Sequence, residues 1–153
     1  MSQKKTFMML KPDALDQGLA LSITSYFKKY GFTIEAFDVV TATRELTAVH
    51  YEEVIGRLGE DFGRKMFDYF CGKTVVPMIL CREEGDAIEE GRRMIGATNP
   101  ADAAPGTIRG DLCSDSYEKS ASENRCVQNL IHASDSEESV KREASIWLPG
   151  YEL

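Results

Sequence analysis

Short apolar segments of β-type residues alternate along this chain with segments whose apolar residues recur at helical spacing. Residues 6–10 are apolar and end at Lys11-Pro12-Asp13, which predicts a buried strand followed by a turn. Further strands are expected at 32–43, 74–81 and 127–131, and helices at 19–30, 47–58, 62–71, 87–95 and 135–147. The strands are too few for a barrel, so the pattern predicts an α/β sandwich, a sheet covered by helices.

Local residues add detail to this outline. Pro77, inside the third expected strand, predicts a bulge or an edge position. Ser134 and Glu137 are spaced as a capping box before the last helix. Two prolines and two glycines make residues 98–110 a loop, either structured or disordered. Residues 114–124 are polar and are the best candidate for a mobile segment.

The composition limits the kind of partner that the chain can have. With 153 residues, of which 42% are hydrophobic, it is long enough for one domain with one core, expected over residues 1–153. Its net charge of −7 gives no attraction to nucleic acid or to an anionic membrane surface. An anionic ligand must therefore be held by a few locally placed cations.

The chain has the features of a cytoplasmic protein. No stretch approaches the roughly 20 apolar residues that span a bilayer, and the apolar run before Lys11 is too short for a signal peptide. The four cysteines have no metal-binding spacing, and we expect them to be reduced thiols.

Two histidines and one apparent phosphate-binding motif are the first candidates for chemistry. Gly72-Lys73-Thr74 looks like the end of a Walker A loop, but Phe67 stands where that motif needs glycine and the order of strand and helix is reversed. His50 lies in a helical stretch and is expected at the surface or half-buried. His132 ends an apolar run just before a helix start, where a structural role, a nucleophile and a proton shuttle are all open.

Three cations occupy positions that a phosphate site could use. Lys11 directly follows a buried strand, Arg92 lies toward the end of a predicted helix, and Arg109 lies between glycines in the loop 106–110. Flanking glycines permit close backbone approach, and a guanidinium suits bidentate phosphate contact. Taken singly, each of them is better explained as a solvated charge.

The residues around His132 resemble a known family. Residues 129–136, Asn-Leu-Ile-His-Ala-Ser-Asp-Ser, are similar to the signature of the phosphorylated histidine in nucleoside diphosphate kinases. Other motifs of this family have counterparts here in the same order: Lys11-Pro12-Asp13, His50-Tyr51, Gly91-Arg92, residues 96–102 and residues 105–111. The resemblance extends over residues 5–148, and several motifs in the correct order rarely arise by chance.

The resemblance implies an activity and a set of site residues. Such an enzyme transfers the γ-phosphate of a nucleoside triphosphate, with ATP the expected donor, to a nucleoside diphosphate in a ping-pong cycle that maintains nucleoside triphosphate pools. His132 would be the nucleophile, phosphorylated at its pros nitrogen (Nδ1), supported by Glu143, with Lys11 and Tyr51 also catalytic. Mg²⁺ would be held mainly by the nucleotide phosphates, without a dedicated protein ligand. The residues that would bind the nucleotide are Lys11, Phe62, Arg92, Thr98, Arg109 and Asn129.

The resemblance also implies a fold and an assembly. The expected fold is a ferredoxin-like sandwich with a four-stranded antiparallel sheet, and the expected assembly is a homo-oligomer, a tetramer or hexamer built from dimers. Residues 114–124 look like an insertion between Arg109 and His132, and Phe62 is the best replacement for the family's base-stacking phenylalanines. Two rival functions are a non-catalytic interaction protein and a nucleic-acid-binding sheet, which the charge of −7 opposes.

Overall fold

A computed structural model describes residues 3–153, so the first two residues of the predicted domain 1–153 lie outside the described residues. The strands are β1 (Lys5–Leu10), β2 (Thr33–Phe37), β3 (Val40–Thr41), β4 (Thr74–Cys81) and β5 (Ile131–Ala133). The helices are α1 (Pro12–Asp16), α2 (Ala20–Lys29), α3 (Arg44–His50), α4 (Glu52–Leu58), α5 (Glu60–Phe70), α6 (Ala87–Ile95), α7 (Ile108–Leu112), α8 (Tyr117–Ser122) and α9 (Glu137–Trp147), with a 3₁₀ helix at Pro100–Asp102. No helix within 3–153 is long and apolar enough to cross a membrane.

The strands form an antiparallel sheet in the order β2-β4-β1-β5, with β3 also paired to β4. The predicted ferredoxin-like sandwich is confirmed. The sheet has five strands rather than four, because the strand expected at 32–43 is divided into β2 and β3.

Pro77 explains why that strand is divided. β4 lies between β2 and β1, so the edge position predicted for Pro77 is wrong, and the register shift lies in β2, between Ile34 and Ala36. The Pro77 carbonyl accepts a hydrogen bond from Asp38 N at 3.1 Å. In an antiparallel strand, the backbone nitrogen and carbonyl of one residue point toward the same neighbouring strand. The nitrogen of Pro77, which carries no hydrogen, therefore faces the gap between β2 and β3.

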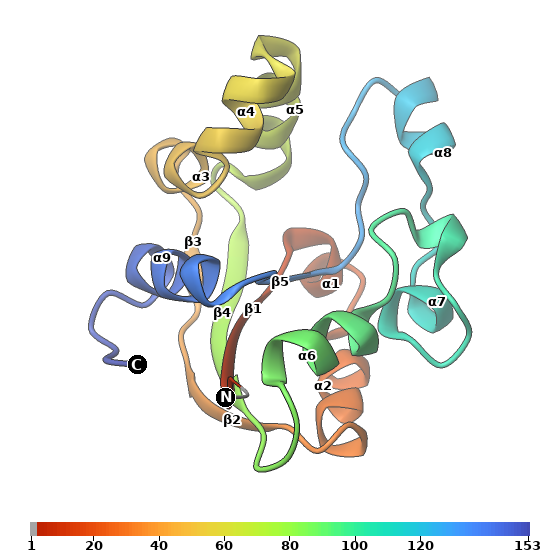
Figure 1. Cartoon of the computed structure of the whole chain (residues 1–153). Coiled ribbons are helices and arrows are strands. Elements are labelled where there is room, and N and C mark those ends of the chain that lie inside the picture. Colours follow the sequence, from red (N-terminus) through yellow and green to blue (C-terminus); the bar gives the residue numbers. More distant parts are fainter. Residues whose placement is uncertain (1–2) are drawn as a thin grey trace.

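Helices cover both faces of the sheet (Figure 1). β1 alternates, with Phe7 and Met9 facing one side and Met8 and Leu10 the other. The first pair packs with α5 and α9, and the second with α2 and α6. Residues 6–10 of β1 are thus buried, and the residue that follows the strand, Lys11, is also buried.

Two helices differ from the sequence prediction. The helix expected at 47–58 is two helices, α3 and α4, because the backbone of Tyr51 (φ −103°, ψ 16°) leaves the helical range. α3 starts earlier than predicted, since the Thr43 hydroxyl caps it by accepting from Leu46 N at 3.1 Å. The helices predicted at 19–30, 62–71 and 87–95 are confirmed as α2, α5 and α6 with small changes at their ends.

The segment between α6 and β5 is more regular than expected. Residues 98–110 are a structured loop that contains the 3₁₀ helix and the start of α7. The segment predicted to be mobile, 114–124, forms α8, which begins where the Ser116 hydroxyl accepts from Lys119 N at 3.0 Å. Asp115 and Arg125 form an ion pair at 2.7 Å, which joins the two ends of this segment.

The last strand and helix begin later than predicted. β5 starts at Ile131 rather than Val127, because Leu130 has a left-handed backbone (φ 73°) in a γ-turn closed by Ile131 N donating to Asn129 O at 2.9 Å. The capping box of α9 is formed by Ser136 with Ser139, not by Ser134 with Glu137. The Ser134 hydroxyl is therefore available for a different contact.

Candidate active site

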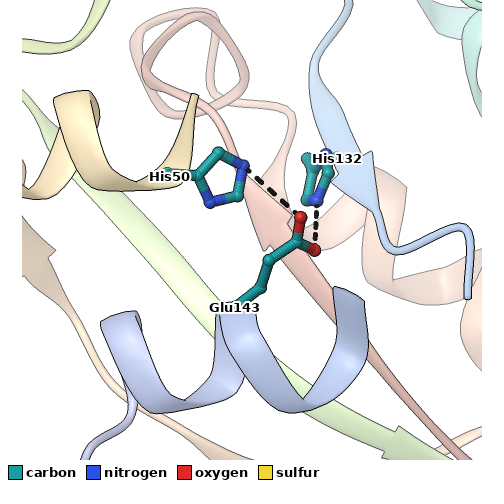
Figure 2. A group of neighbouring side chains, drawn as sticks. All are labelled: His50, His132 and Glu143. Carbon is teal, nitrogen blue, oxygen red and sulfur yellow. Dashed lines mark hydrogen bonds and ion pairs between the residues drawn. The ribbon is translucent and has the colours of Figure 1, made fainter. Parts of the chain in front are cut away.

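His132 lies on β5 with its side chain on the α9 side of the sheet. Its register partner on β1 is Met9, whose side chain belongs to the core beneath α9. The Nε2 atom of His132 lies 2.7 Å from Oε1 of Glu143, which comes from α9 (Figure 2). The ring is about 20% exposed, whereas the carboxylate is buried. The two residues that the sequence proposed as nucleophile and support are therefore in direct contact.

Glu143 is an ionised acceptor. Burial alone would raise the pKa of Glu143, but its hydrogen bond to His132 and the charges around it outweigh burial and lower this pKa. Its Oε1 also accepts from the hydroxyl of Ser134. A carboxylate can only accept, so a neutral His132 carries its proton on Nε2 and leaves the lone pair of Nδ1 free.

Lys11 and Arg109 are the buried cations of the site. Lys11 Nζ donates to Asn129 Oδ1 at 2.7 Å, and burial together with the positive charge of Arg109 lowers the pKa of Lys11 to about 8. Burial, followed by the charge of Arg92, lowers the pKa of Arg109 to about 10. Two desolvated cations in one place are costly unless an anion joins them.

Arg109 already uses much of its guanidinium. Its Nε, Nη1 and Nη2 atoms donate to the carbonyls of Asn129 (3.1 Å), Gly96 (3.1 Å) and Ile131 (2.6 Å). Arg109 thus holds both ends of the γ-turn that precedes His132. The sequence suggested only a phosphate-binding role, and the structure adds a role in stabilising the fold.

Arg92 reaches the site from α6. Its Nη1 donates to the carbonyl of Ala133, next to His132, at 3.1 Å, and the residue is otherwise exposed. Gly91 makes this approach possible, because a Cβ there would lie 2.6 Å from Met8 Cε on β1. α6 therefore lies close enough to the sheet for the neighbouring arginine to reach β5.

Asn129 connects the buried cations to the loop after α6. Its Nδ2 donates to the carbonyl of Thr98 at 3.0 Å, while its Oδ1 accepts from Lys11. Thr98 itself is exposed. Of the residues proposed to bind the nucleotide, Lys11, Thr98, Arg109 and Asn129 are therefore linked by direct contacts.

Tyr51 lies at the junction of α3 and α4. Its hydroxyl is buried and has no hydrogen-bond partner within the described part of the chain. Burial raises the pKa of Tyr51 far above its ordinary value, so the phenol is a neutral donor. An unpaired buried hydroxyl costs about 1–3 kcal/mol, a cost that a bound acceptor would remove.

A cleft of about 580 Å³ opens beside His132. His132, Glu143, Tyr51 and Arg92 line it, together with residues of α4 and α9. The other predicted nucleotide-binding residues are not among its lining residues, and Phe62 is half-buried on α5. The structure thus places four of the predicted site residues in this cleft and does not place Phe62 there.

Sequence reasoning missed three residues around Glu143. His50 was expected at or near the surface but is buried, and its ring centre lies 4.8 Å from that of His132. Ser134 was assigned to a cap and instead donates to Glu143. Arg142 Nη2 lies 3.4 Å from Glu143 Oε2. For His50 the signal was present in the His50-Tyr51 motif, whereas local periodicity carried none.

His50, His132 and Glu143 also offer three metal-ligand atoms within 4.8 Å of one another. The indole Nε1 of Trp147 donates to His50 Nδ1 at 2.8 Å, so Nε2 of a neutral His50 carries a proton and has no lone pair for a metal. Magnesium, moreover, prefers oxygen ligands. This group is therefore better explained as a hydrogen-bonded network than as a metal site.

Fold and site together define a phosphotransferase: a histidine with one free nitrogen, a carboxylate behind it, and cations gathered from distant segments. Residues 4–153 match the family model described as nucleoside diphosphate kinase. The chain belongs to the nucleoside diphosphate kinase family, and is thus a transferase of nucleotide metabolism.

Curated relatives and solved structures agree with this assignment. A nucleoside diphosphate kinase of Pyrococcus furiosus is 40% identical over 98% of this chain and 86% of the relative. One of Heliobacterium modesticaldum is 39% identical, covering 98% and 91%. A Borrelia burgdorferi enzyme, solved as a transition-state mimic with vanadate and ADP, has a TM-score of 0.86 at 31% identity, covering 94% of this chain and 86% of that one. The Pyrobaculum aerophilum enzyme has a TM-score of 0.80 at 34% identity, covering 94% of each chain.

Proposed function

We propose that this nucleoside diphosphate kinase works through a phosphohistidine on Nδ1 of His132. The observation that carries the proposal is the 2.7 Å contact of His132 Nε2 with Glu143, which leaves Nδ1 as the free nucleophilic nitrogen. The Borrelia relative, whose structure carries vanadate and ADP, supports chemistry at phosphorus on this fold.

Each half-reaction exchanges one bond for another. The Nδ1 lone pair of His132 attacks the γ-phosphorus of ATP, and the bond from that phosphorus to the β–γ bridging oxygen breaks, with its electrons passing to departing ADP. The ring becomes positively charged as the bond forms, and Glu143 stabilises this charge through Nε2–H. An oxygen of the β-phosphate of a second nucleoside diphosphate then attacks the phosphorus, the bond to Nδ1 breaks with its electrons returning to the ring, and the nucleotide leaves as a triphosphate.

The cations stabilise the charge on the transferring group. Phosphoryl transfer spreads negative charge over oxygens, so positioned donors supply most of the catalysis. We assign this role to Lys11, Arg92 and Arg109, with Tyr51 donating its unpaired hydroxyl to the phosphoryl group. Thr98 and Asn129 would bind the phosphates and sugar, and Phe62 would stack on the base.

Magnesium fits this site only when it arrives on the nucleotide. No carboxylate cage surrounds His132 among the residues that the structure describes, and the nearest donor group holds two histidines. Bound to the nucleotide's phosphates, Mg²⁺ would supply charge neutralisation. The chain's own residues would then orient the phosphates against His132.

The surface supports a homo-oligomer built from dimers, with tetramer and hexamer both open. β2 is an edge strand. Ile34 and Phe37 on this strand and Val39 just after it are exposed, with exposed fractions of 43%, 65% and 63%. An exposed apolar edge is a surface on which a second copy can pair.

Both sheet faces are covered, which argues against nucleic-acid binding on the sheet. The four free cysteines suit a cytoplasmic location.

We also propose that residues 114–124 are an insertion into a single domain and act on assembly or nucleotide binding rather than on chemistry. Replacing residues 116–124 with two glycines keeps Asp115 and Arg125, which pair at 2.7 Å. The replacement is expected to change the oligomeric state or the KM for nucleotide, measured by light scattering and steady-state kinetics, and to leave phosphohistidine formation intact. Loss of self-phosphorylation in a folded oligomer would contradict this assignment.

The function is tested by phosphorylation of the protein itself. Incubation with γ-³²P-ATP and Mg²⁺ is expected to give a label that is stable to base and labile to acid, and that passes to added GDP on a second incubation. A non-catalytic interaction protein would acquire no label. A label that is stable to acid, or that cannot be transferred to GDP, would exclude the ping-pong mechanism.

A further inference from the structure

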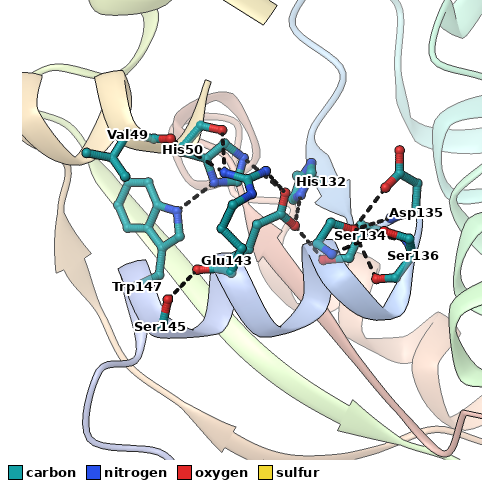
Figure 3. Close-up of polar contacts among 12 residues, drawn as sticks. Val49, His50, His132, Ser134, Asp135, Ser136, Glu143, Ser145 and Trp147 are labelled. Atoms are coloured by element: carbon teal, nitrogen blue, oxygen red, sulfur yellow. Dashed lines mark hydrogen bonds and ion pairs between the residues drawn. The ribbon is translucent and has the colours of Figure 1, made fainter. Parts of the chain in front are cut away.

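Trp147, the only tryptophan of the chain, determines where His50 can hold a proton. The indole Nε1 donates to His50 Nδ1 at 2.8 Å, and both side chains are buried (Figure 3). An indole nitrogen can only donate, so Nδ1 must keep its lone pair. The neutral ring therefore carries its proton on Nε2, because a proton on Nδ1 would oppose the indole N–H.

That Nε2–H faces the oxygen of Glu143 that His132 does not use. His50 Nε2 lies 3.9 Å from Oε2, whereas His132 Nε2 lies 2.7 Å from Oε1 (Figure 2). The two imidazole rings meet edge to face at 79°. The carboxylate thus has one oxygen directed to each histidine, with Arg142 also 3.4 Å from Oε2.

The surroundings keep His50 neutral. Burial, and then the neighbouring His132, lower the pKa of His50 well below its ordinary value, and Arg142 and Lys11 act in the same direction. Glu143 opposes them. The groups that face His50 come from α9 (Glu143, Arg142), from β5 (His132) and from the end of β1 (Lys11), and the adjacent Tyr51 is neutral.

We propose that Trp147 and His50 are positioning residues for phosphoryl transfer, an inference that rests on His132 being the nucleophile. Trp147 orients His50, and His50 orients Oε2 of Glu143, so that Oε1 stays on His132 Nε2–H. A protonated His50 would instead form an ion pair with Glu143 and draw its charge away from His132. Trp147 and His50 thus keep the Glu143 carboxylate in contact with His132.

The first test is Trp147→Phe, which keeps a ring and removes the indole donor. The rate of phosphohistidine formation from γ-³²P-ATP and Mg²⁺ in a single turnover is expected to fall about tenfold at pH 7.5, the lower end of the loss seen when an outer partner of a metal-bound histidine is removed. The KM for ATP should change much less than this rate. Trp147→Phe with a wild-type rate would overturn the proposal.

The pH profile separates positioning from general loss of packing. Without the indole N–H, Nδ1 of His50 is free to accept a proton, so the decline of the rate at low pH should begin at a higher pH than in the wild type. His50→Gln cannot be protonated, so the double variant Trp147→Phe/His50→Gln should lose this displacement. If the shift of the pH profile persisted in the double variant, it would come from a group other than His50, and this result would refute the mechanism.

A conservative variant of His50 provides a rescue test that does not depend on Trp147→Phe folding. Glutamine offers an oxygen to Trp147 and an N–H to Glu143, whereas leucine offers neither. His50→Gln should therefore phosphorylate His132 much faster than His50→Leu at equal folded fraction, judged by circular dichroism. Equal rates in the two variants would contradict a positioning role.

Two controls separate this inference from the proposed function. Tyr151→Phe removes an aromatic donor four residues after Trp147, where the hydroxyl contacts Glu35 and Lys5, and it should keep the wild-type rate and pH profile. A slow Tyr151→Phe would mean that the assay reports the C-terminal packing and would overturn the assignment to Trp147. Absence of label in the wild type would refute the function itself, whereas normal wild-type labelling with unchanged variants would refute only the positioning role.

Discussion

His132→Asn is expected to abolish self-phosphorylation, lowering its rate by roughly 10⁴-fold or more, as for loss of other nucleophiles. Asparagine has no nitrogen lone pair that can attack phosphorus. The buried carboxylate of Glu143 keeps the hydroxyl of Ser134 as a donor, so the substitution removes the chemistry without leaving that carboxylate unpaired. Label incorporated from γ-³²P-ATP at equal protein concentration measures the effect.

The second histidine provides the matched control. The chain has only two histidines, so a base-stable, acid-labile label that survives in His50→Gln and disappears in His132→Asn is assigned to one residue. Nucleotide binding, measured by calorimetry with ADP and Mg²⁺, should persist in His132→Asn because Lys11 and Arg109 are unchanged. A wild-type label in His132→Asn would refute the proposed mechanism.

Arg109→Met is expected to lower the free energy of unfolding by about 3–5 kcal/mol, because a buried acceptor left without its donor costs roughly 1–3 kcal/mol. The guanidinium serves three backbone carbonyls, of Gly96, Asn129 and Ile131. Against a total stability of about 5–15 kcal/mol, this is a large loss. Urea unfolding followed by circular dichroism measures it, and phosphohistidine formation should fall in the fraction that remains folded.

Arg92→Met is the matched substitution at an exposed cation. Within residues 3–153, the Arg92 guanidinium donates to one backbone carbonyl, that of Ala133, and this contact is only partly buried. Its loss should change the free energy of unfolding by about 1 kcal/mol or less, while the KM for nucleotide rises. Equal destabilisation by the two substitutions would show that Arg109 does not hold the γ-turn before His132.

Much of the fold was predictable from local pattern. The apolar run of β1 and the helical stripes of α2 and α6 are formed by neighbouring residues, so periodicity identified them. The failures lie where a tertiary contact overrides the local signal. Pro77 lies in an inner strand because β2 and β3 leave a gap opposite it, and Asp115 and Arg125 order a segment whose composition predicted mobility.

The site divides in the same way. The order of motifs around Lys11, Arg92, Arg109 and His132 was enough to predict the family, which the comparisons confirm. Local periodicity did not reveal that His50 is buried beside His132, because its partner Trp147 is 97 residues away. Phe62 was proposed as the best replacement for the base-stacking phenylalanines of the family, and its place in the nucleotide site is still a prediction.

The sequence by itself determined that this acidic chain, with a net charge of −7, is an α/β protein with the motifs of the nucleoside diphosphate kinase family. Only the tertiary structure decided how those residues are used: which nitrogen of His132 is free, that Arg109 stabilises a strained turn, and that Trp147 sets the proton of His50. The physical reason is that hydrogen-bond direction depends on where the partner lies. Those partners are brought together only by folding.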